Sequence, residues 1–213
     1  EGDSGHPLGF VAAFSDVSRQ NKAKGELESI IRDIRFVTET AAAMMDLPHG
    51  ADIYGFIADA LFHLAPPQSI VVLSSVSKGF VVRLEAIRGE GKHIAAISGI
   101  MGRPLEGLSF HPPAEYLGPS LPHSFIELEG GIDTLTFGLL PGELCRKIQD
   151  LPFFEKVIGR GLWWGGTLHG ITAILLPPGS TPDNTDILDL FVLHCAAVLQ
   201  RRETEQVLRG TEI

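Results

Sequence analysis

Two segments with the spacing of long helices enclose a middle part with the spacing of β-strands, and this order restricts the folds open to the chain. Apolar side chains recur every three or four residues from position 27 to 44, and again from position 187 to 199. Between them, from Phe80 to Ala86, apolar and polar residues alternate as in a half-buried strand. The order predicts an α+β domain: an antiparallel sheet of about six strands, with the long N- and C-terminal helices packed together on one face.

The first helical segment carries a heptad stripe of apolar residues over about three heptads. Its members are Leu27, Ile30, Ile34, Val37, Ala41 and Met44. Ile31, Thr38 and Met45 widen the stripe on one flank, so the helix can pack on two elements at once. We expect one side to face its own domain and the other to face a partner helix in a homodimer. An ordinary amphipathic core helix is the alternative.

The rest of the chain divides into shorter elements that glycines and prolines separate. We expect strands at residues 70–73, 80–86, 94–100, 125–128, 134–139, 162–164 and 169–176, and helices at 53–64 and 141–151. The last two strands flank Gly165 and Gly166, which is a hairpin signal. A further strand is expected at residues 8–14, followed by a helix that Asp16 or Ser18 caps.

Composition excludes several classes of partner. The 213 residues carry a formal net charge of −9, whereas nucleic acids and anionic membranes are bound by clustered Lys and Arg. Two cysteines are too few for a disulfide framework, which favours the reducing cytoplasm. No apolar run approaches the ~20 residues of a membrane span. The chain opens at Glu1 without an initiator Met, and we expect it to be part of a longer protein.

Residues 33–208 resemble a GAF domain, the small-molecule sensing module of signalling proteins. The likeness is strongest at residues 101–110 (MGRPLEGLSF), 161–166 (GLWWGG), 170–176 (GITAILL) and 196–205 (AAVLQRRETE). The last three of these segments in combination resemble GAF modules of archaeal, methanogen-type sensor histidine kinases. The resemblance implies a cytoplasmic, regulatory module of a two-component system.

Residues 9–19 (GFVAAFSDVSR) are similar to the last strand and exit motif of a PAS domain. The two resemblances together imply three regions. Residues 1–18 would end a PAS-like domain, 19–50 would form a linker or signalling helix, and 51–213 would form the GAF domain with a projecting C-terminal helix. They also imply PAS and histidine-kinase domains in the same parent chain.

We expect no catalysis from this fragment. Histidine-kinase ATP sites use an Asn-rich helix, and the only asparagines here are Asn21 and Asn184. Residues 89–93 (GEGKH) lack the spacing of a phosphate-binding loop and are interpreted as a hairpin turn. The eight histidines show none of the close spacings of a zinc site, so no metal is expected. The cyclic-nucleotide and bilin motifs of other GAF domains are also missing.

The main functional hypothesis is a sensory domain for a small ligand or a redox change. Its cavity is expected between the sheet and the insert, which we define as residues 101–122. Aromatic side chains with a few polar tips are typical of such pockets, and the candidate lining is Phe110, His111, Tyr116, His123 and Phe125. The output would be a shift of the heptad stripe against its partner.

Two alternatives remain open. Cys145 lies near the start of a short helix, where the helix dipole favours a thiolate. The resemblance to methanogen sensor kinases implies that such a cysteine can hold haem, with His111, His123 or His194 as axial ligand. An unmodified, half-buried cysteine is the simpler interpretation of Cys145. The other alternative is a ligand-free dimerisation or spacer module, which needs only the two long helices.

Overall fold

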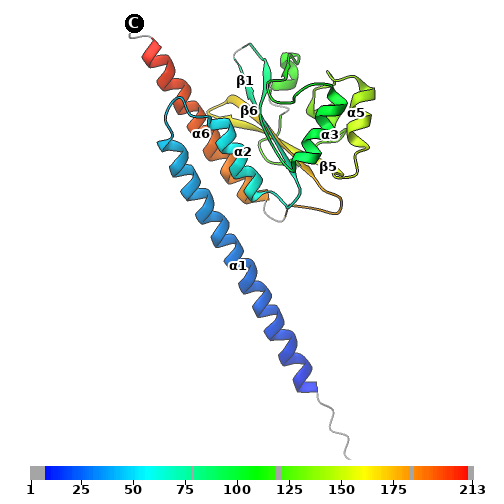
Figure 1. The fold of residues 1–213 in the computed structure, drawn as a ribbon. Coiled ribbons are helices and arrows are strands. Elements are labelled where there is room, and N and C mark those ends of the chain that lie inside the picture. Colours follow the sequence, from blue (N-terminus) through cyan, green and yellow to red (C-terminus); the bar gives the residue numbers. More distant parts are fainter. Residues whose placement is uncertain (1–7, 78, 119–120, 183–184, 211–213) are drawn as a thin grey trace, which may run out of the picture. The chain divides into compact units, whose positions relative to one another are not determined.

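The computed structural model describes residues 8–77, 79–118, 121–182 and 185–210. The chain divides into two compact units, Glu1–Glu39 and Thr40–Ile213. Most of helix α1 (Leu8–Asp46) lies in the first unit, and every other element lies in the second (Figure 1). Within the described residues, every helix is too short or too polar to cross a lipid bilayer.

The second unit is built on a six-stranded antiparallel sheet with the strand order β3-β2-β1-β6-β5-β4. The strands are β1 (Ile70–Val76), β2 (Val82–Arg88), β3 (Ser109–Phe110), β4 (Ile126–Glu127), β5 (Lys156–Trp164) and β6 (Thr167–Leu176). The central strands β1, β5 and β6 contain the predicted strand segments 70–73, 162–164 and 169–176. The α+β class and the antiparallel sheet are therefore confirmed.

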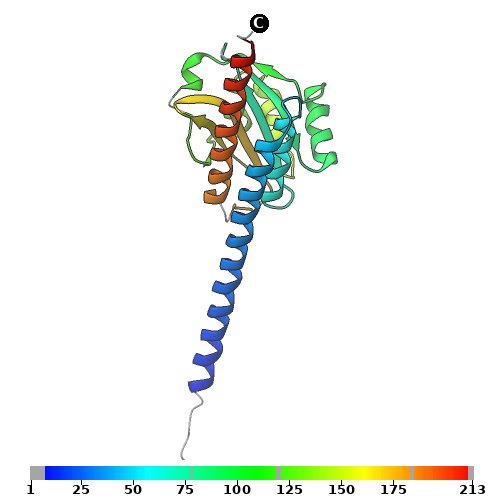
Figure 2. The same cartoon turned by 90° about the vertical axis from the view of Figure 1, so that its left-hand side faces the viewer.

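Helices α2 (Ile53–Leu64) and α6 (Thr185–Gly210) pack on one face of this sheet (Figure 2). Asp52 caps α2 by accepting a hydrogen bond from the Gly55 amide at 2.8 Å. Leu61 of α2 and Phe191 of α6 are fully buried, because the apolar residues of each helix recur with the helical period. This layer holds one half of the core.

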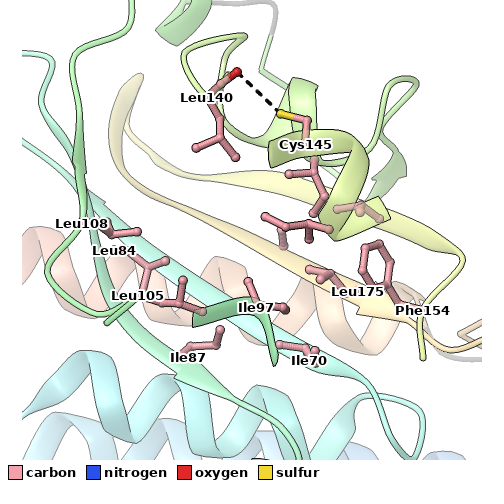
Figure 3. Close-up of a cluster of buried hydrophobic side chains, with 14 residues drawn as sticks. Ile70, Leu84, Ile87, Ile97, Leu105, Leu108, Leu140, Cys145, Phe154 and Leu175 are labelled. Atoms are coloured by element: carbon pink, nitrogen blue, oxygen red, sulfur yellow. Dashed lines mark hydrogen bonds between the residues drawn. The ribbon is translucent and has the colours of Figure 1, made fainter. Parts of the chain in front are cut away.

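Shorter helices lie on the other side of the sheet: α3 (Gly91–Met101), α4 (Ile132–Leu135), α5 (Gly142–Gln149) and the 3₁₀ turn η1 (Ala114–Leu117) (Figure 1). Apolar side chains of α3, of the α4–α5 segment and of the insert join those of the sheet in a second buried cluster, which contains Ile97, Leu108 and Leu140 (Figure 3). The insert predicted as a loop with a short helix has this form, with β3 and η1 as its only regular elements among its described residues.

Two strands predicted in this region are helical. Residues 94–100 belong to α3, where only Ile97 of the helix is fully buried. Residues 134–139 form the end of α4 and a turn in which Phe137 and Gly138 have φ of +57° and +66°. Both segments are short apolar runs. Such a run fits a buried strand as well as a buried helix, and its packing in the folded protein determines which one forms.

The strand predicted at residues 8–14 is also wrong, because α1 already begins at Leu8. Asp16 and Ser18 therefore lie inside the helix and do not cap it. A lone strand leaves its backbone groups unpaired, whereas a helix pairs its own. The rest of the proposed PAS end, residues 1–7, lies outside the described residues.

The β5–β6 hairpin turns at Gly165 and Gly166, as the sequence predicted, with φ of +54° and +78°. Close to the turn, Leu162 pairs with Gly170 while Trp163 pairs with Leu168. His169 is therefore an extra residue in β6, a β-bulge, and its side chain is fully buried. Gly170 next to it lies directly against the carbonyl oxygen of Ser74 in β1.

Candidate ligand pocket

A cavity of about 90 Å³ lies between the sheet and the elements that cover its insert side. Its floor is formed by the sheet residues Val72, Ser74, Val82, Leu84, Ile87, Ile171, Ala173 and Leu175. Its walls come from α3, the insert, and the segment from α4 to α5, and they are Ile97, Met101, Leu105, Leu108, Phe110, Ile132, Leu135, Thr136, Phe137, Leu140 and Ile148. Figure 3 shows how several of these side chains converge from the sheet and the helices. The cavity is where a ligand was predicted to bind.

The lining is almost entirely apolar. Among the described residues that form it, the polar side chains are Ser74 and Thr136, and none is charged. The Thr136 hydroxyl is already used, because it donates to the Ile132 carbonyl at 2.8 Å. The Ser74 hydroxyl makes no hydrogen bond to another described residue. Among these lining residues, the Ser74 hydroxyl is therefore the one that can still donate a hydrogen bond to a bound molecule.

Of the predicted lining residues, Phe110 lines this cavity. His111 and Tyr116 are exposed. His123 is also exposed and stacks on Trp163, with the ring centres 5.0 Å apart. Phe125 is buried elsewhere, with the Arg160 guanidinium 6.0 Å from its ring centre.

Sequence reasoning missed the residues that form most of the walls. Ile97 was assigned to a strand, Met101 to the insert and Leu135 to another strand, so their common face was not apparent. Their spacing of three or four residues within α3 was the available signal, but a run this short also fits a buried strand. Leu105 and Leu108 show the same spacing inside the insert.

Cys145 is buried beside this cavity, and its thiol donates to the Leu140 carbonyl at 3.7 Å (Figure 3). Burial raises the pKa of the Cys145 thiol above its ordinary value, and the nearby Asp133 carboxylate raises it further. The sequence predicted the opposite effect, a thiolate favoured by the helix dipole. In the folded protein desolvation outweighs that dipole.

The residues present do not fit a haem. Ligand pockets that hold molecules of drug size or larger have volumes of roughly 300–1,000 Å³, and the cavity here is far smaller. The suggested axial ligands His111, His123 and His194 are all exposed, although His194 was expected on the apolar face of the last helix. Within the part of the chain that the structure describes, no cluster of His, Cys, Asp or Glu could hold a metal ion.

Polar contacts hold the last residue of the insert and the segment that follows it to β5 and α6. The Phe125 amide donates to Asp189 Oδ1 at 2.9 Å, and the Gly161 amide donates to the Pro122 carbonyl at 2.9 Å. Arg160 of β5 donates to the same Asp189 carboxylate at 2.6 Å. One acidic side chain of α6 therefore joins a sheet strand and the segment that closes the insert.

The C-terminal turns of α6 contact the connection between α1 and α2. Arg202 donates to the Leu47 carbonyl at 2.5 Å, and His49 Nε2 lies 3.3 Å from Glu205 Oε2. Between Arg202 and Glu205 in the sequence, Glu203 Oε1 lies 3.3 Å from Nδ1 of the buried His169. The helix thus links the sheet, the insert and the point where α1 enters the second unit.

Comparison with known proteins shows the fold. No family model and no curated protein matches the chain. Among solved structures, the GAF domain of a putative sensor histidine kinase from Pseudomonas syringae pv. tomato has a TM-score of 0.55 at 15% identity, over 89% of this chain and 99% of that one. The GAF domain of an Acinetobacter phosphoenolpyruvate-protein phosphotransferase has a TM-score of 0.53 at 10% identity, over 80% and 94%.

A third similar structure is the phycoerythrobilin-bound GAF domain of a cyanobacterial phytochrome, with a TM-score of 0.53 at 10% identity, over 82% of this chain and 96% of that one. All three share the antiparallel α+β architecture with this chain at identities too low to carry a function. The chain therefore has a GAF-like fold, as the sequence resemblance implied.

Proposed function

We propose that the chain is the sensory GAF domain of a multidomain signalling protein and that it binds a small molecule in the cavity between sheet and insert. The observation that carries the proposal is the cavity itself, which has an apolar lining with one available hydroxyl. It lies where a ligand can contact the sheet, α3 and the insert at once. We propose that the domain itself catalyses no reaction.

The helices supply a route for output. α1 has 39 residues and enters the domain, and α6 has 26 residues and leads out of it. Leu27, Ile30 and Ile34 of the heptad stripe are between 42% and 57% exposed. A regular apolar stripe in water favours a partner helix, so we propose a homodimer through these long helices.

The Asp189 contacts provide the coupling between pocket and helix. A ligand that moves the insert would act on the Phe125 amide, and hence on the carboxylate that α6 contributes. The same carboxylate accepts a hydrogen bond from Arg160 in the sheet. We therefore expect α6 to change between discrete positions on the sheet and not to move continuously. α6 would then shift relative to its partner in the dimer.

The parent protein is proposed to be a cytoplasmic sensor histidine kinase. The likeness to methanogen-type GAF modules and the fold shared with a GAF domain of a putative sensor kinase support this proposal. A preceding PAS-like domain that ends near residue 18 is supported by the sequence resemblance, although residues 8–14, which were predicted as its last strand, belong to helix α1.

A thermal-shift screen of the purified chain against small metabolites tests the function. A molecule that binds the native state raises the melting temperature in proportion to the logarithm of its concentration. Spin labels on α6 should then report a changed distance across the dimer when that molecule is added. A screen in which no compound stabilises the protein would contradict the proposal.

The small volume of the cavity favours a second candidate, a ligand-free dimerisation or spacer module. Such a module needs the helices and a stable core but no bound molecule. The same screen separates the two functions, because the spacer predicts a dimer whose melting temperature and helix distances respond to no compound.

A further inference from the structure

The lining of the cavity restricts the chemistry of its ligand. We infer that the ligand is a small uncharged molecule, apolar over most of its surface, with a single hydrogen-bonding group placed at Ser74. This inference rests on the proposed function and narrows it to a ligand class. It follows from the charge, the volume and the one unused hydroxyl of the site.

Charge is the first restriction. The described lining contains no Lys, Arg or His that could pair with a phosphate or carboxylate, and no Asp or Glu that could pair with an ammonium group. A charge buried without a partner is strongly unfavourable, since neither water nor an opposite charge compensates it. Glu106, beside the pocket residue Leu105, is exposed and outside the lining, and its carboxylate accepts from the Ile87 amide and from Arg88. Nucleotides, amino acids and organic acids are therefore disfavoured.

Volume is the second restriction. An engineered apolar cavity of roughly 150 Å³ in another protein accepts benzene or xenon. The cavity here, at about 90 Å³, is smaller than that one, so a single ring fits only when the flexible Met101 side chain in the wall moves aside, and a tetrapyrrole or a nucleotide does not fit. We therefore expect a ligand of at most about seven non-hydrogen atoms.

Ser74 supplies the specific contact. Its backbone lies at an irregularity between β1 and β2, where Leu73 pairs with Ala86 while Ser74 pairs with Leu84. Such bulges redirect side chains beside functional sites. The residue is 9% exposed, lines the cavity, and its hydroxyl can both donate and accept a hydrogen bond. The next residue, Ser75, is outside the lining and donates to Glu85 at 2.6 Å.

Phenol, toluene and benzoate test the inference as probes. Phenol and toluene are nearly equal in size and differ in one hydroxyl, and benzoate adds a charge. Methyl resonances of Ile97, Leu108 and Ile171 would be followed by NMR during titration of the full chain. We expect saturable shifts with phenol and toluene, a dissociation constant about fivefold lower for phenol, which corresponds to one net hydrogen bond, and no saturable shift with benzoate.

Variants assign the preference to one side chain. Ser74→Ala should make the dissociation constants of phenol and toluene equal and leave toluene binding intact. Ser75→Ala is the matched control and should keep the fivefold preference. Ala173→Val should reduce binding of both probes by narrowing the floor of the cavity. If Ala173→Val does not fold, the comparison of the two serine variants still decides the inference.

Several results would overturn the inference: no probe binds the cavity, benzoate binds as well as phenol, or Ser74→Ala keeps the preference for phenol. Failure of the proposed function has a different signature. If phenol binds as described but neither it nor any metabolite changes the distance between α6 helices, the ligand class stands and the sensory role does not. If a charged metabolite binds and moves α6, the sensory role stands and the ligand class is wrong.

Discussion

Arg160 Nη1 in β5 donates to Asp189 Oδ1 in α6 at 2.6 Å, and this contact joins the sheet to the C-terminal helix. The guanidinium is 4% exposed, and it donates a second bond, to the Asp189 carbonyl, at 3.0 Å. The carboxylate also accepts the Phe125 amide. Because a buried cation without its partner is costly, this pair is a sensitive point for both stability and coupling.

Asp189→Ala should lower the free energy of unfolding by about 2–4 kcal/mol, because it leaves the buried Arg160 charge uncompensated. The measurement is urea unfolding followed by circular dichroism. Asp186→Ala, in the exposed first turn of the same helix, is the control and should cost less than about 1 kcal/mol. Equal effects of the two substitutions would show that the ion pair has no special role.

Two glycine-to-alanine substitutions should change stability in opposite directions. At Gly170 an added methyl group would collide with the Ser74 carbonyl, so we expect a loss of about 1–3 kcal/mol. At Gly99, inside α3, nothing lies within 4 Å of the added carbon, and the change should stabilise by about 0.5–1 kcal/mol. Urea midpoints that move in the same direction for both variants would contradict the packing described for β6.

Stability should fall at alkaline pH. Burial raises the pKa of Tyr54 well above its ordinary value of 10.0, and the carboxylates of Glu85 and Glu203 raise it further. Burial likewise raises the pKa of the Cys145 and Cys195 thiols above 9.0. The unfolded chain therefore releases these protons at a lower pH than the folded chain, and stability declines as pH rises above about 9.

Unfolding free energies measured between pH 7 and pH 11 test this sign. Each group contributes a decline of up to about 1.4 kcal/mol per pH unit between its unfolded and folded pKa. Tyr54→Phe should make the decline above pH 10 shallower. Tyr116→Phe is the control, because Tyr116 is 49% exposed, and it should leave the profile unchanged. A flat profile for the unaltered protein would refute the burial of these groups.

The heptad stripe of α1 should hold a dimer together. Ile30→Asp combined with Ile34→Asp places two charges on the exposed stripe and should convert the dimer to a monomer in sedimentation equilibrium. Arg32→Asp reverses a charge on the opposite side of the same helix and should leave the dimer intact. A monomeric starting protein, or a double variant that still dimerises, would rule out this interface.

Much of the fold was predictable from local patterns, and the pocket was not. The continuous apolar run that became β1 and the glycines between β5 and β6 needed no distant partner to be interpreted. Residues 94–100 could be interpreted only with knowledge of a distant partner, since Ile97 is buried because α3 covers the sheet. Because residues 94–100 fit the period of a strand, the sequence did not predict that they form a wall of the cavity. The predicted lining contained aromatic residues such as Tyr116, which lies at the surface.

The sequence by itself determined the antiparallel α+β architecture, the two long helices and the hairpin, because the period of apolar residues and the backbone freedom of glycine act over a few neighbouring positions. Only the tertiary structure decided which side chains enclose the cavity, that burial raises the pKa of the Cys145 thiol, and that Asp189 meets Arg160 across 29 positions of sequence. These features depend on which strands are neighbours in the sheet and on how far each side chain is desolvated. A local sequence pattern contains neither kind of information.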